Sequence, residues 1–244
     1  MKKFKFFAMI LFCGQMSFAQ MDNFTTAPVY QFPALRIPNL QNVDISLDFL
    51  RDDKAADLVK PDLYAGVDGT PFLAEKWLNA RIKLADSRVF DSVSIKLNLF
   101  ENKVYFKDNN NREREVGIRV MQIEIRDASS EWNNAIFLSG FGANTNSYYQ
   151  VLGDGKKIGY LKEMVVLQKE YKVLHAATQK KFELYNGKLF LYAQGILYDV
   201  NRDCASFMPA FGNDSKVTNY MSSNGLKCHK EKDLLKLVDY YNSY

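Results

Sequence analysis

The sequence predicts an α+β fold, in which an antiparallel β-meander or roll of about nine or ten short strands precedes a small C-terminal helical tail. Apolar and polar residues alternate from Thr70 to about Val200, and turn residues separate the alternating runs. After Val200 the apolar period changes to that of helices. A strand-rich body followed by helices is the α+β arrangement.

These changes of pattern divide the chain into four segments. We expect a signal peptide at residues 1–19, an irregular leader or linker at 20–68, the antiparallel β domain at 69–201, and a helical segment packed on it at 202–244. The leader holds four of the six prolines, which interrupt regular ladders. Within it, the alternating run at residues 43–50 has the pattern of an edge strand.

The first residues have the form of a secretory signal. Three lysines precede a short apolar run at residues 6–12, and small residues then predict cleavage between Ala19 and Gln20. The run is far shorter than the roughly 20 residues that span a bilayer. Cys13 offers a lipoprotein alternative, which the bulky Phe12 before it disfavours. We therefore expect export to the periplasm or cell surface, with no transmembrane segment after signal removal.

Charge argues against a nucleic-acid partner. Without its first 19 residues, which hold three lysines and no acid, the chain has 29 basic and 28 acidic residues. Residues 156–181 contain seven lysines, but these alternate with apolar residues as on the wet face of a sheet. Binding to nucleic acid needs a concentrated basic footprint, so we expect none.

Two glycine-containing stretches are interpreted as turns between strands. Gly153-Asp154-Gly155 is followed by two lysines, but no helix pattern follows and the Walker spacing is absent, so it is a turn and no phosphate loop. Asn186-Gly187 lies between two alternating runs, which predicts a tight hairpin, since both residues tolerate positive φ.

Three helices are expected after Val200. Asp203 is the predicted cap of a short helix that Gly212 ends, and Asp214 or Ser215 the cap of a second helix that Gly225 ends. The third covers residues 230–242, where apolar residues recur at i, i+4 and i+7.

Cys204 and Cys228 are the cysteines that remain after signal removal. An exported chain meets an oxidising compartment, which favours a disulfide between them, the alternative being two free thiols. With His229 they supply three potential zinc ligands, but the spacing is not that of a zinc site. We assign no metal-binding or cofactor-binding residue.

Catalytic patterns are weak in this sequence. The histidines number two, and His175 is interpreted as a partly buried strand residue. Ser139-Gly140 lacks the leading glycine of a nucleophile elbow. Carboxylate pairs cannot be recognised from sequence because their geometry is tertiary. We assign no catalytic residue.

Three stretches carry a resemblance: GTPFLAEKWLNARIKLADSRVFDSVSIKLNLF (69–100), YYQVLGDGKKIGYLK (148–162) and LKCHKEKDLLKLVDYYNS (226–243). In these stretches the chain resembles a group of exported β-rich proteins of Bacteroidota for which no activity is established. The resemblance implies that the protein is located in the cell envelope and that strands precede helices in its fold. It identifies no functional residue.

The function expected from the sequence is that of a non-catalytic exported envelope protein that acts as a binding or interaction module. Its partner would be an envelope protein, a glycan or a small ligand. The alternatives are a carrier or sensor with an enclosed apolar pocket, and a carboxylate-based envelope hydrolase. Strand aromatics such as Tyr149, Phe190 and Tyr192 are interpreted as cross-strand packing, the alternative being a platform for a sugar or peptide.

Overall fold

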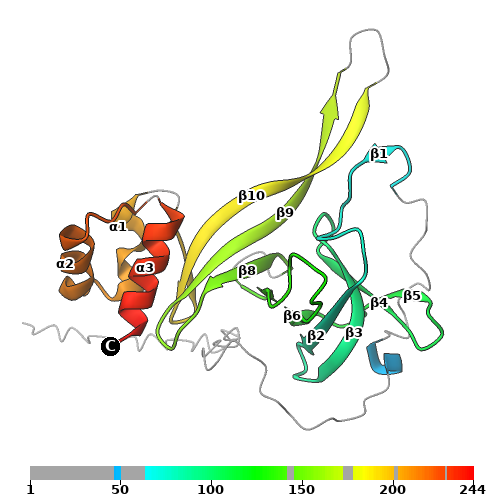
Figure 1. Cartoon of the computed structure of the whole chain (residues 1–244), viewed down its shortest axis with the longest axis horizontal. Coiled ribbons are helices and arrows are strands. Elements are labelled where there is room, and N and C mark those ends of the chain that lie inside the picture. The colour runs from blue at the N-terminus through cyan, green and yellow to red at the C-terminus, as the bar shows by residue number, and fades with distance from the viewer. Residues whose placement is uncertain (1–46, 51–63, 142–145, 173–177, 201–202, 229) are drawn as a thin grey trace, which may run out of the picture.

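The computed structural model describes residues 47–50, 64–141, 146–172, 178–200, 203–228 and 230–244. In this part of the chain, eleven strands form one sheet, and three α-helices pack at one end of it (Figure 1). The strands are β1 Val67–Asp68, β2 Leu78–Leu84, β3 Val89–Asn98, β4 Lys103–Lys107, β5 Glu113–Glu115, β6 Val120–Ile125, β7 Ile136–Leu138, β8 Tyr148–Gly153, β9 Gly159–Tyr171, β10 Gln179–Ala193 and β11 Ile196–Asp199.

Two meanders make up the sheet. Strands β2 to β5 pair in sequence order, strands β6 to β11 pair in sequence order, and β2 pairs with β6 to join them. Every one of these pairs is antiparallel, but β1 pairs with β10 in parallel, Val67 opposite Lys180. The sheet is therefore mixed, and the expectation of a purely antiparallel sheet of nine or ten strands is wrong. A two-residue strand is too short to show a period in sequence.

The alternating run at residues 43–50 does not form the predicted edge strand where it is described. Leu47–Leu50 is a 3₁₀ helix, η1, and the main-chain oxygen of Leu50 accepts a hydrogen bond from the amide of Gly117. The Leu50 side chain is fully buried in the hydrophobic core formed mainly by strands β2 to β6, which are here called the β2–β6 body. Burial of this leucine against a loop outweighs the weak preference for a strand.

The predicted hairpin at Asn186-Gly187 is also wrong. Strand β10 runs through both residues and stays paired with β9, with a register shift between Asn186 and Leu189. A Cβ at Gly187 would overlap the main-chain oxygen of Glu163 on the neighbouring strand. Glycine is therefore needed here because the two strands approach closely, and not because the chain turns. The tight turn lies at Gln194-Gly195, where both φ angles are positive, 51° and 83°.

The helices follow the sequence prediction closely. They are α1 Cys204–Phe207, the 3₁₀ helix η2 Met208–Phe211, α2 Ser215–Ser223 and α3 Glu231–Asn242, here called the helical lobe. Asp203 caps α1 by accepting from the amide of Ser206, and Asp214 caps α2 by accepting from that of Lys216. No helix in the described part of the chain has both the length and the apolar character needed to cross a bilayer.

Candidate functional site

Strands β9 and β10 form a long twisted hairpin that runs from the helical lobe past the rest of the sheet (Figure 1). The outer half of this hairpin, Val165–Tyr171 of β9 with Gln179–Tyr185 of β10, is here called the arm. Strand β8 pairs with β9 only as far as Met164, so the outer edge of β9 has no partner strand along the arm among the described residues. Along Val165–Tyr171, alternate residues direct their main-chain N–H and C=O groups away from β10, toward this edge.

The arm concentrates exposed apolar side chains. Among the described residues, seven large apolar side chains are exposed, and four of them lie in the arm. Leu167, Tyr171 and Tyr185 belong to one face, because Val165 pairs with Tyr185 and Tyr171 with Gln179. Leu184 lies on the opposite face and is 52 % exposed. The three exposed apolar side chains that share a face, Leu167, Tyr171 and Tyr185, are of the kind that marks an interaction surface.

The opposite face of the arm is packed on the β2–β6 body. Val166 and Phe182 are buried there, and Phe182 makes edge-to-face contacts with Tyr64 and Phe100, with ring centroids 5.3 and 5.2 Å apart. Asn98 donates from Nδ2 to the Tyr64 hydroxyl at 2.7 Å. These contacts hold the arm in place while its outer face stays uncovered.

The arm itself holds three lysines and two glutamates, and ion pairs join Lys169 and Lys181 to Glu183 and Lys180 to Glu170. Residues 162–188 contain six lysines and three glutamates. Glu183 pairs with Lys169 at 2.7 Å and accepts from the Tyr171 hydroxyl, and these hydrogen bonds, that from Lys169 first, lower the pKa of Glu183 to about 2. The excess of positive charge therefore comes from Lys162, Lys172 and Lys188, which flank the arm, and it would attract an acidic partner.

A separate polar cavity of about 340 Å³ lies between strands β4–β6 and the start of β8. Lys103 at its rim lies 3.1 Å from Glu115 and 3.6 Å from Glu101, so both carboxylates are engaged. On its wall the hydroxyls of Ser139 and Tyr148 donate to the main-chain oxygen of Val120, and burial raises the pKa of Tyr148. The lining is polar and the cavity is open, unlike the enclosed apolar pocket of a carrier.

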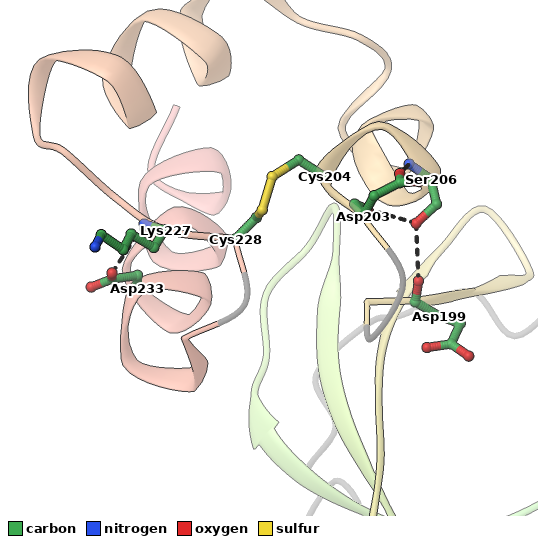
Figure 2. Close-up of a disulfide and its surroundings, with 7 residues drawn as sticks. All are labelled: Asp199, Asp203, Cys204, Ser206, Lys227, Cys228 and Asp233. Atoms are coloured by element: carbon green, nitrogen blue, oxygen red, sulfur yellow. Dashed lines mark hydrogen bonds between the residues drawn. A yellow bond between two sulfur atoms is a disulfide. The ribbon is translucent and has the colours of Figure 1, made fainter.

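Cys204 and Cys228 form a disulfide with their Cα atoms 5.6 Å apart (Figure 2). The bond joins the first residue of α1 to the segment that leads into α3. Beside it, the Ser206 hydroxyl donates to the main-chain oxygens of Asp203 and Asp199, and the amide of Lys227 donates to Asp233 (Figure 2). The disulfide thus fixes the start of the helical lobe to its last helix.

The turn at Gly153–Gly155 connects β8 to β9, as predicted, and it also receives the last helix. Asn242 of α3 accepts from the amides of Lys157 and Ile158 at 3.0 and 3.2 Å and donates to the Ile158 oxygen at 2.9 Å. A Cβ on Gly155 would overlap the Asn242 side chain. The glycine therefore leaves room for a helix to dock, which the local sequence did not reveal.

Several candidates from the sequence lie outside the described residues: Ala19, Gln20, Cys13, His175 and His229. Within the described part of the chain, no group of three or more His, Cys, Asp or Glu side chains is arranged to hold a metal ion. The structure therefore assembles the cysteine pair and leaves the other candidates untested.

Comparison with protein-family models, with curated proteins and with solved structures gives no match. The resemblance to exported Bacteroidota proteins consequently stays a prediction. The arm was missed from sequence because alternation shows which side chains share a face and not what covers that face. The seven lysines between residues 156 and 181 were its one visible signal.

Proposed function

We propose that this chain is a non-catalytic, exported interaction module whose arm binds an extended, acidic segment of another envelope protein. The observation that carries this proposal is the gathering of three exposed apolar side chains on one face of the arm, beside an unpaired strand edge. An extended segment that pairs with the edge of β9 would satisfy its main-chain groups and cover Leu167 and Tyr171. The excess of lysine in residues 162–188 favours acidic side chains on that segment.

The alternatives receive less support. The cavity near Lys103 is polar, so it does not favour an apolar ligand, and its two rim carboxylates are held by the same ammonium group. A hydrolase of the two-carboxylate type needs one acid free to act as a base and one with a raised pKa. The disulfide supports export, since such bonds persist in oxidising compartments.

Site-specific photo-cross-linking in intact cells tests the proposal. A photoreactive residue replaces Leu167 on the arm, and the matched control replaces Lys236, an exposed residue of α3. We expect one protein to be captured from position 167 and not from 236. A synthetic peptide of the captured segment should then bind the purified protein, and Lys180→Glu with Lys181→Glu should weaken that binding at least about tenfold.

Three results would contradict the proposal. The first is capture of a second copy of this chain from position 167, which would make the arm a self-interface. The second is capture of the same protein from positions 167 and 236. The third is no capture from position 167 although the variant is exported and folded.

A further inference from the structure

The outer face of strands β2–β4 carries a second group of aromatic and basic side chains, remote in sequence from the arm. Trp77 precedes β2, and Lys96 of β3 and Lys107 of β4 place their ammonium groups 5.4 and 5.1 Å from the centroid of its indole ring. Lys96 also lies 5.1 Å from the ring of Phe72. These four residues are here called the Trp77 platform.

The platform is built on firmly packed strands. Lys96 pairs with Tyr105 across β3 and β4, and the Tyr105 ring contacts Phe72 edge-to-face at 6.0 Å. Phe72 forms an isolated bridge with Asn98, a fully buried residue. All four platform residues are half-buried, so none of them is fully covered. Because these side chains are already held in place by packing, a ligand that binds them would lose less free energy in ordering them.

The two lysines have no carboxylate partner in the described part of the chain, unlike Lys103 and Lys169. Glu113 is opposite Lys107 in the β4–β5 register, yet the contacts that Lys107 makes are with the indole. Two like charges therefore share one ring, and no ion pair within the described part of the chain offsets their repulsion. An anion at this position would gain two ionic partners.

We propose that the Trp77 platform binds an acidic sugar unit of a polysaccharide. The apolar face of a pyranose ring would stack on the indole, and its carboxylate would take hydrogen bonds from Lys96 and Lys107. A neutral sugar would make no ionic contact with the two lysines, and a simple inorganic anion would have no apolar face to stack on the indole. A site for single-stranded nucleic acid needs a row of basic residues and several aromatic rings on which successive bases stack. The Trp77 platform is shorter than such a row.

Titration of the purified full-length protein with trigalacturonate, followed by tryptophan fluorescence, tests this inference. We expect saturable quenching that weakens as salt is raised, and at least about tenfold weaker binding of the neutral maltotriose. Because the chain has a second tryptophan, Trp132, the Trp132→Phe variant isolates the signal of Trp77. This variant should bind trigalacturonate as the wild type does.

Two variants assign the ligand to the platform. Lys96→Ala with Lys107→Ala should weaken trigalacturonate binding at least about tenfold. The control pair, Lys156→Ala with Lys236→Ala, removes the same charge from exposed positions elsewhere and should leave the affinity unchanged. Circular dichroism and thermal midpoint should match the wild type for both pairs.

The inference is overturned if trigalacturonate does not bind, if maltotriose binds equally well, or if the control pair loses as much affinity as Lys96→Ala with Lys107→Ala. It is also overturned if a single-stranded dT oligonucleotide binds through the same two lysines more tightly than trigalacturonate. The cross-linking experiment on the arm is independent of each of these outcomes.

Discussion

The two halves of the β9–β10 hairpin have the same local structure and very different surroundings. At the base, Tyr160 and Leu191 pack against the helical lobe, while Leu161 and Tyr192 on the other face pack with Phe141. In the arm, Val166 and Phe182 on one face are buried, while Leu184 on that face and three large apolar side chains of the other face are exposed. Covering both faces at the base lets the same two strands extend beyond the body with one face open.

This difference explains what the helical lobe contributes. A two-stranded hairpin is marginally stable by itself. Here the lobe buries one face of the base, and the disulfide and Asn242 hold the lobe together and in contact with the β8–β9 turn. We therefore expect changes in the lobe to cost stability and changes on the outer face of the arm to cost binding.

The largest effect should come from Phe211, which is fully buried in the helical lobe. Phe211→Ala removes a large side chain from a packed core and should reduce the free energy of unfolding by about 4 kcal/mol. Equilibrium unfolding in guanidinium measures this. A loss below about 1 kcal/mol would show that the lobe does not support the base.

Removal of the disulfide should have the next largest effect. Cys204 and Cys228 are 24 residues apart, and Cys204→Ala with Cys228→Ala should cost about 3 kcal/mol in the chain-entropy account. Intact mass should show two added alkyl groups only when the unfolded protein is first reduced. Labelling of unfolded protein without reduction would disprove the bond.

The contact between the β8–β9 turn and α3 should show strong coupling. Asn242→Ala removes three hydrogen bonds, and Gly155→Ala displaces the same side chain, so each should cost about 1–2 kcal/mol. In the double variant the new methyl group meets a small residue, so the loss should be close to that of Asn242→Ala alone. Additive losses in a double-mutant cycle would refute this contact.

Alkaline pH should weaken the attachment of the arm. Burial raises the pKa of Tyr64 from 10.0 to about 12, so its stabilising effect is complete below pH 10 and is lost as the pH rises from 10 to 12. Tyr64→Phe should lose less stability over this range, although it leaves Asn98 without its acceptor at neutral pH. Thermal unfolding from pH 8 to 12 compares the two proteins, and parallel profiles would exclude Tyr64 as the group responsible.

The smallest effect on stability should come from the outer face of the arm. Leu167→Ser with Tyr185→Ser changes two exposed side chains and should alter the free energy of unfolding by about 0.5 kcal/mol or less. The same variant should lose partner capture from a photoreactive residue at Tyr171. Retained capture would place the interaction elsewhere.

The sequence predicted local structure better than it predicted surroundings. Alternation located most strands, and capping residues such as Asp203 and Asp214 located the helix starts, because both depend on neighbours in sequence. Gly187 was interpreted through turn chemistry, whereas its position is set by the close approach of Glu163. Gly155 lies in a turn as predicted, but it also leaves room for Asn242, and both contacts are distant in sequence. The unpaired edge of β9 depends in the same way on where β8 stops pairing, after Met164.

Hydrogen exchange of the purified protein, read by mass spectrometry, tests the difference between the two halves most directly. Main-chain amides of Gly159–Leu161 and Phe190–Ala193 should exchange at least about tenfold more slowly than those of Leu167–Tyr171, where β9 has β10 as its one partner strand in the described part of the chain. Equal protection along the whole hairpin would contradict the account, because it would mean that the arm is as firmly covered as the base.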